Sequence, residues 1–92
     1  MIKNFKDKFS EQLWSGKHVR KFQSFRIQAL RRLDILNAVV RLEDLMLNPG
    51  NRFESLTGDR QGQFSIRINR KWRICFEWDG QNSRNVEIID YH

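Results

Sequence analysis

The chain has 92 residues, of which 39% are hydrophobic, and a formal net charge of +6. This length predicts one small domain over residues 1–92, and the hydrophobic content excludes a chain that is disordered by composition. The single cysteine excludes an internal disulfide, as is typical of proteins in a reducing cytosol. No apolar run approaches the roughly 20 residues that cross a bilayer, and the first residues lack the apolar stretch of a signal peptide. We therefore expect a cytoplasmic protein without membrane contact.

The first half of the chain predicts a short strand followed by helices. Residues 2–6 are suited to a strand and residues 7–14 to a short helix. A longer helix begins near Ser24, with apolar residues at spacings of three and four that predict a core-facing side. This stripe comprises Phe22, Phe25, Ala29, Leu33, Leu36 and Val40. A weaker second stripe predicts contact with another neighbour and comprises Ile27, Ile35 and Ala38. An apolar turn at 42–47 ends at the helix breaker Asn48-Pro49-Gly50-Asn51.

The second half predicts a run of antiparallel strands. An extended segment at 52–56 and a turn at 57–59 lead into two segments, 64–68 and 72–78, in which apolar residues alternate with period two. A loop at 79–84 and a strand at 86–90 complete the chain. Strand, helices and then antiparallel strands predict an α+β fold, with the helices packed on one face of one sheet.

The predicted hairpin brings two like charges together. With residues 69–71 as its turn, Arg67 lies directly opposite Arg73, and like charges in that position destabilise a sheet. Such a pair on the solvent face indicates either a small tolerated cost or a bound anion. We take a polyanion to be the better interpretation.

Positive charge gathers in the first half of the chain. Residues 1–52 contain eleven basic and five acidic side chains, whereas residues 53–92 contain six of each. The segment 17–32, called the basic block below, has no acidic residue. Its cations are Lys17, Arg20, Lys21, Arg26, Arg31 and Arg32. The basic block is suited to a phosphate backbone, although a merely solvated helix face gives the same pattern.

The residue types favour chemistry without a metal or a cofactor. Two histidines and one cysteine cannot supply the ligand cluster of a structural zinc site, and the phosphate-loop, dinucleotide and zinc-protease motifs do not occur. RNA can be cleaved with acid–base and cationic side chains alone. The 2′-hydroxyl attacks the adjacent phosphorus, a base removes its proton, an acid protonates the leaving 5′-oxygen, and cations stabilise the developing charge.

The candidates for this chemistry lie near the end of the chain. A histidine side chain can change protonation near neutral pH, so His92 can act as acid or base. Tyr91 can donate a hydrogen bond or stack on a nucleobase, and either Glu54 or Asp90 can serve as the base. Each of these also has a purely structural interpretation, such as a terminal residue, a half-buried strand aromatic or the close of a strand. Arginine grips phosphate oxygens in bidentate fashion, so Arg73 is assigned to the phosphate. The RNA-binding candidates are Arg67 and Lys71, with Lys17, Arg20, Lys21, Arg31 and Arg32 of the basic block.

Three motifs taken together resemble the HigB toxins of the RelE/ParE superfamily, and within them the GraT-like branch. They are the turn Gly58-Asp59-Arg60, the strand Trp72-Arg73-Ile74-Cys75-Phe76 and the closing Asp90-Tyr91-His92. The resemblance covers nearly the whole chain. It implies a microbial-RNase-like fold with a small twisted antiparallel sheet, and a toxin of a type II toxin–antitoxin pair that cuts mRNA in the ribosomal A site.

The resemblance also assigns roles to residues. The conserved strand arginine of the family matches Arg73, and its terminal acid, tyrosine and histidine match Asp90, Tyr91 and His92. The chain departs from the other HigB branch at Glu54 and Thr57, where that branch has a histidine and a lysine. A carboxylate at residue 54 can still act as a base beside arginine.

The implied partners are a HigA-like antitoxin with a helix-turn-helix domain, in a hetero-oligomeric complex, and the 70S ribosome with its mRNA. In this interpretation the basic block docks on ribosomal RNA. Two alternatives remain open: a ParE-like toxin that inhibits DNA gyrase without nuclease activity, and a non-catalytic RNA- or DNA-binding module that uses the basic block alone.

Overall fold

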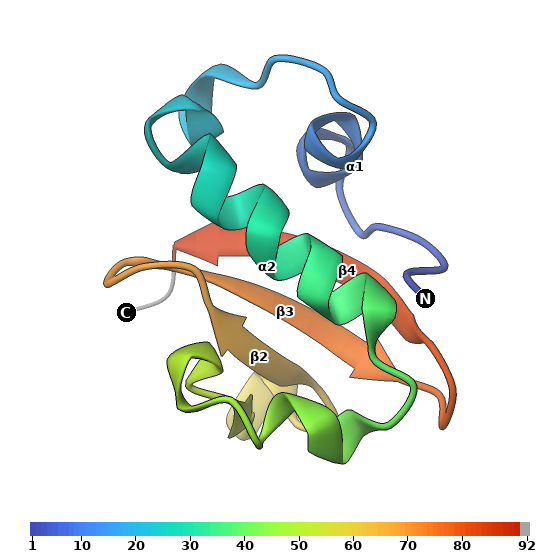
Figure 1. Ribbon diagram of the computed structural model, residues 1–92. Coiled ribbons are helices and arrows are strands. Elements are labelled where there is room, and N and C mark those ends of the chain that lie inside the picture. Colours follow the sequence, from blue (N-terminus) through green and yellow to red (C-terminus); the bar gives the residue numbers. More distant parts are fainter. Residues whose placement is uncertain (91–92) are drawn as a thin grey trace.

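The computed structural model describes residues 1–90, and the candidates Tyr91 and His92 lie outside this range. The helices are α1 (Lys8–Trp14) and α2 (Arg26–Ala38), with short 3₁₀ turns at Arg20–Phe25, Leu42–Leu45, Pro49–Asn51 and Gly58–Arg60. The strands are β1 (Glu54–Ser55), β2 (Phe64–Arg67), β3 (Trp72–Trp78) and β4 (Ser83–Asp90). Both α-helices precede the strands and cover one face of the sheet, which confirms the predicted α+β architecture (Figure 1). Within residues 1–90 no helix is both long enough and apolar enough to cross a membrane.

The sheet is antiparallel, with its strands in the order β1-β2-β3-β4. In the β2–β3 hairpin Ile66 pairs with Ile74 and Arg67 with Arg73, which confirms the register predicted from the alternation. Because successive side chains of a strand point to opposite faces, the isoleucines lie on the side of the helices and the two arginines on the other side. We call this second side the outer face.

Residues 2–6 form no regular strand, so this part of the prediction was wrong. The segment instead makes two isolated parallel bridges to β4, from Ile2 to Ser83 and from Phe5 to Val86. Asn85 lies between the two bridged positions of β4 and has a left-handed backbone, with φ of 51°. A left-handed residue interrupts the extended geometry of a strand, which explains why the pairing does not continue as a ladder.

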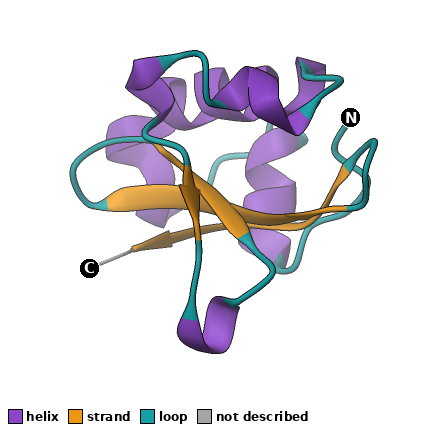
Figure 2. Ribbon diagram, turned by 90° about the horizontal axis from the view of Figure 1, so that it is seen from below, coloured by secondary structure: helices purple, strands orange, loops and turns teal. Residues whose placement is uncertain are grey.

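The core lies between the helices and the inner face of the sheet (Figure 2). The stripe of α2 supplies Ala29, Leu33 and Leu36, all fully buried, against sheet residues such as Ile66 and Ile74. Aromatic rings close the core near the β2–β3 turn. Phe25 stacks on Trp72 with ring centroids 4.9 Å apart, and Phe22 meets the same indole edge-on at 5.7 Å.

Both helical stripes were predicted to include residues that the structure shows to be exposed. α2 ends at Ala38, and Val39 is already extended, so Val40 turns outward and is 75% exposed. The second stripe largely faces solvent rather than a neighbour, because Ile27 is 71% exposed and Ala38 is also exposed. In the predicted apolar turn 42–47 only Leu45 is buried.

Ser10 connects α1 to the sheet through a buried hydrogen bond. Its buried Oγ accepts a hydrogen bond of 3.0 Å from the backbone N–H of Ile88, on the edge of β4. The side chain of Asp7 caps the same helix by accepting from the N–H of Ser10 at 3.1 Å. The hydroxyl therefore supplies the acceptor that an edge strand otherwise lacks.

We expect Ser10→Ala to lower the free energy of unfolding by about 1–3 kcal/mol, because it leaves the buried N–H of Ile88 without an acceptor. Urea unfolding measures this change. Ser15→Ala is the matched control: it removes an exposed hydroxyl that bonds the Glu11 carbonyl within α1, and should cost under about 0.5 kcal/mol. Equal effects of the two variants would contradict this role of Ser10.

Candidate functional site

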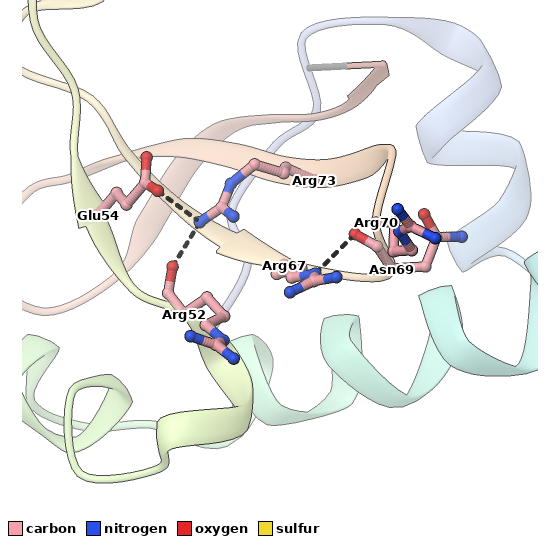
Figure 3. A pocket seen from close by; sticks show the side chains of 6 residues that line it. All are labelled: Arg52, Glu54, Arg67, Asn69, Arg70 and Arg73. Carbon is pink, nitrogen blue, oxygen red and sulfur yellow. Dashed lines mark hydrogen bonds and ion pairs between the residues drawn. The ribbon is translucent and has the colours of Figure 1, made fainter. Parts of the chain in front are cut away.

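A pocket of about 360 Å³ opens where the outer face of the sheet meets the turn that precedes β1 (Figure 3). It is lined by Arg52, Glu54, Arg67, Asn69, Arg70 and Arg73. The ladder explains why three predicted residues meet here. Glu54 pairs with Ser65 and Arg67 with Arg73 on neighbouring strands, and the alternation directs these side chains to the outer face. The predicted residues Glu54, Arg67 and Arg73 therefore share one site.

Arg73 is the fixed cation of the pocket. It is only 8% exposed, and its Nε donates to Ser65 Oγ at 2.8 Å. Its Nη2 donates to the carbonyl oxygen of Arg52 and lies 4.0 Å from Glu54 Oε1. A buried charge is costly unless acceptors surround it, and here serine, carbonyl and carboxylate oxygens do so. The guanidinium is thus held in one orientation before any ligand binds.

Arg67 is oriented by the hairpin turn. Its Nε donates to the carbonyl oxygen of Asn69 at 2.9 Å. The side chain of Asn69 in turn accepts from the backbone N–H groups of Lys71 and Trp72, each at 2.9 Å, which fixes the turn. The two facing arginines therefore have different partners, so their charges are held apart by separate sets of hydrogen bonds.

Arg52 and Arg70 also line the pocket, and neither was among the predicted site residues. Arg52 follows the helix breaker directly and has a left-handed backbone, with φ of 46° and ψ of 49°. Its N–H donates to the Pro49 carbonyl at 3.1 Å. Their positions in the sequence could have indicated this, because Arg52 follows a Pro-Gly turn and Arg70 lies at the tip of a hairpin. Turns of this kind bring residues to the ends of adjacent strands.

The charge of the lining is strongly positive. Four arginines face a single carboxylate, that of Glu54, whose side chain is 51% exposed. Such a pocket suits an anion with several oxygen atoms, and guanidinium groups match phosphate geometry. The carboxylate beside the fixed cation is positioned to accept a proton from a ligand held there.

A model of a protein family, described as the RelE-like toxin of the type II toxin–antitoxin system HigB, matches residues 3–92. The chain belongs to this HigB family. It is 44% identical over 80 residues to Toxin HigB-1 of Vibrio cholerae, covering 85% of this chain and 84% of that protein. An uncharacterized protein of Haemophilus influenzae is 29% identical over 62 residues, covering 67% of this chain and 60% of its own length.

The fold is shared with solved structures of Staphylococcus aureus proteins. The YoeB–YefM complex matches with a TM-score of 0.64 at 20% identity, covering 100% of this chain and 95% of the matched chain. The YoeB dimer matches with a TM-score of 0.56 at 19% identity, covering 99% and 94%. These likenesses confirm the predicted RelE-like fold. As a HigB-family toxin of a type II system, the chain has an antitoxin as its partner.

Two predicted residues of this HigB-family chain lie away from the pocket. Asp90 pairs with Trp72 in the β3–β4 ladder, so it shares the face of that indole and not the face of Arg73. Its Oδ2 lies 3.4 Å from Lys71 Nζ, and neither residue lines the pocket. Within residues 1–90 the structure therefore separates Asp90 and Lys71 from Glu54, Arg67 and Arg73.

The basic block lies in the helical layer. Lys17, Arg20, Lys21 and Arg31 are exposed there. The Nζ of Lys21 sits 4.7 Å from the centre of the Phe9 ring. Arg32 differs from its neighbours: it is half-buried, and its Nη1 donates to Asn51 Oδ1 at 2.6 Å.

Cys75 is also on the outer face but is buried. Burial raises the pKa of its thiol to about 11, against an opposing effect of the Arg60 charge. A neutral thiol is a poor nucleophile, which argues against a covalent role. Residues 1–90 contain no group of three or more His, Cys, Asp or Glu side chains that could hold a metal ion.

The raised pKa of Cys75 predicts a pH dependence of stability. Between about pH 9 and pH 11 the unfolded chain loses the thiol proton while the folded chain keeps it, so the free energy of unfolding falls as pH rises through this range. Urea unfolding at pH 8 and pH 10.5 measures the fall, which should be smaller in Cys75→Ala. An identical pH dependence in the two proteins would contradict the assignment.

Proposed function

We propose that this toxin is a ribosome-dependent endoribonuclease that cuts mRNA in the ribosomal A site, without a metal ion. The observation that carries the proposal is the pocket in which the buried guanidinium of Arg73 lies 4.0 Å from the carboxylate of Glu54. A fixed cation beside an exposed proton acceptor is what cleavage by a neighbouring 2′-hydroxyl requires. Membership of the HigB family supports the same conclusion.

The cationic side chains bind and orient the scissile phosphate. Arg73 is held by Ser65 and by the Arg52 carbonyl, so it needs no reorganisation when negative charge develops on the phosphate oxygens. Arg67, directly opposite on the ladder, contacts the phosphate from the other strand. Preorganised donors of this kind account for a large share of the rate enhancement in many enzymes.

Proton transfer completes the reaction. Glu54 takes the proton of the 2′-hydroxyl as that oxygen bonds to phosphorus, and the bond from phosphorus to the 5′-oxygen breaks. The leaving oxygen takes a proton from an acid, and the products are a 2′,3′-cyclic phosphate and a free 5′-hydroxyl. With Glu54 as the base, His92 is the proposed acid, because an imidazole can serve as acid or base, and Tyr91 can donate a hydrogen bond or stack on a nucleobase. Asp90 then acts indirectly, by fixing the end of β4 through Lys71.

Binding to the ribosome uses a different surface. The exposed cations of the basic block lie in the helical layer, whereas the pocket lies on the outer face of the sheet. The toxin can therefore dock its helical side on ribosomal RNA while the pocket receives mRNA. This task places the protein in the cytoplasm, and the antitoxin is a HigA-like helix-turn-helix protein that forms a hetero-oligomer with it.

We expect Glu54→Gln to slow mRNA cleavage on programmed ribosomes by about 10²–10⁴-fold, because the amide cannot accept the proton. The rise of the rate with pH that reports the ionised base should disappear as well. Glu77→Gln, an exposed carboxylate elsewhere on β3, is the control and should cut normally. Primer extension maps the cut ends, with ribosome-free mRNA in parallel. An unaltered pH–rate profile in Glu54→Gln would remove Glu54 from the mechanism.

The same assay separates the proposed function from its rivals. A ParE-like toxin would leave mRNA intact on programmed ribosomes and inhibit supercoiling by DNA gyrase. A non-catalytic module would bind RNA tightly without producing cut ends. The wild-type protein is expected to cut, and either of these other results would overturn the proposal.

Docking through the basic block has its own test. The triple variant Lys17→Ala, Arg20→Ala, Arg31→Ala should weaken ribosome binding and reduce its dependence on salt. The slope of the logarithm of the binding constant against the logarithm of the salt concentration should become shallower by about 0.7–0.9 for each phosphate group that is no longer neutralised. A control that removes three exposed cations elsewhere changes Lys3, Arg41 and Arg84 to Ala. Equilibrium binding to 70S ribosomes at several salt concentrations decides. Equal slopes for the two triple variants would rule out specific docking by the basic block.

A further inference from the structure

Arg32 and Arg31 are adjacent arginines of α2, yet they occupy different environments. Arg31 is exposed, whereas Arg32 is half-buried and reaches from the helix to the turn at residues 48–52. Its Nη1 donates to Asn51 Oδ1 at 2.6 Å, a short hydrogen bond assisted by charge. Its Nη2 lies over Gly50, where an added Cβ would be in van der Waals contact with it at 3.4 Å. The guanidinium of Arg32 is thus engaged in a hydrogen bond within the fold.

Asn51 transmits this contact to the turn. Asn51 is only 1% exposed, and its side-chain Nδ2 donates to the Leu45 carbonyl at 3.1 Å. The amide therefore bonds on one side to the helix and on the other to the preceding 3₁₀ turn. A buried amide that lost either partner would carry an unsatisfied polar group, which is costly.

The next residue, Arg52, links the turn to the pocket. Its left-handed backbone costs an arginine about 1–2 kcal/mol, and such a conformation persists only when the surroundings fix it. Those surroundings hold the peptide on both sides. The N–H of Arg52 donates to the Pro49 carbonyl, and its own carbonyl accepts from Arg73 Nη2. One hydrogen bond thus ties α2 to Asn51 and another ties the fixed cation of the pocket to Arg52, and the peptide link between these adjacent residues connects the two.

We propose that Arg32 is a positioning residue, which acts through Asn51 to hold Arg52 and Arg73 in the geometry that binds the scissile phosphate. The inference rests on the proposed function, and it removes Arg32 from the set that docks on ribosomal RNA. Its neighbour Arg31 keeps that docking role. Two adjacent residues of the same type therefore have separable effects on catalysis and on binding.

The decisive variants are Arg32→Lys and Asn51→Ala. The matched control is Arg41→Lys, at an exposed arginine outside the pocket and the basic block. Arg32→Lys keeps the charge but loses the guanidinium, and Asn51→Ala changes no charge, so neither effect can be explained by the removal of a cation that binds phosphate. At saturating ribosome each should lower the single-turnover cleavage rate by roughly tenfold, because small displacements of catalytic groups are expensive. The double variant should be no slower than the slower single variant, since both act through the same hydrogen bond.

Arg41→Lys should cut at the wild-type rate at saturation, because Arg41 is exposed and belongs neither to the pocket nor to the basic block. Wild-type rates in both Arg32→Lys and Asn51→Ala would overturn the proposal. So would a loss of rate in Arg41→Lys as large as that in Arg32→Lys.

Amide hydrogen exchange tests the same positioning without using activity. The amide of Arg52, bonded to the Pro49 carbonyl, should exchange roughly tenfold faster in Arg32→Lys than in wild type or Arg41→Lys. Unchanged exchange would overturn the positioning role even if cleavage fell. Conversely, a wild-type protein that fails to cut mRNA would refute the proposed nuclease, while the exchange rates would still decide whether Arg32 fixes the turn. If Asn51→Ala does not fold, Arg32→Lys alone tests the proposal, because that variant removes no buried amide.

Discussion

The site depends on one buried charge, the guanidinium of Arg73. Removing such a group from water costs several kcal/mol unless acceptors replace the lost hydration. Ser65 on β2, the carbonyl of Arg52 in the preceding turn and the carboxylate of Glu54 on β1 provide that replacement. These acceptors come from three separate segments, so satisfying one cation also fixes the relative positions of the segments. The geometry of the pocket follows from the solvation requirement of Arg73.

Two like charges face each other across the β2–β3 ladder, and their hydrogen bonds explain how the sheet accommodates them. Arg73 is turned toward Ser65 and the β1 side, while Arg67 is turned toward the carbonyl of Asn69 in the hairpin. Each guanidinium thus has its own acceptors, which reduces but does not remove the repulsion between them. A bound phosphate would relieve what remains, since its oxygens can accept from both arginines. The pocket is therefore most favourable electrostatically when an anion occupies it.

The period-two alternation of residues 64–68 and 72–78 was sufficient to predict the hairpin register and the facing pair Arg67 and Arg73. The same rule applied to β4 would have placed Asp90 on the core side, after Val86 and Ile88, so its separation from Arg73 was readable in the sequence. The left-handed backbone of Arg52 could not be predicted from the sequence, because a Pro-Gly turn permits several conformations. The helical period does place Arg32, three residues after Ala29 and four before Leu36, nearer the core than Arg31. It does not reveal the partner of Arg32, because Asn51 lies 19 positions away along the chain.

The fixed and the adjustable parts of the site are distributed unequally over the sheet. Arg73 lies on β3, an inner strand whose other face packs against the core, so the cation inherits the rigidity of the core. Glu54 lies on β1, an edge strand of only two residues, and its side chain is half exposed. The carboxylate can thus move relative to the guanidinium, from which it is separated by 4.0 Å. Catalytic hydrogen bonds are commonly long before substrate binds and shorten afterwards. In the proposed reaction, a phosphate held by the fixed guanidinium of Arg73 would therefore determine where the Glu54 carboxylate comes to rest.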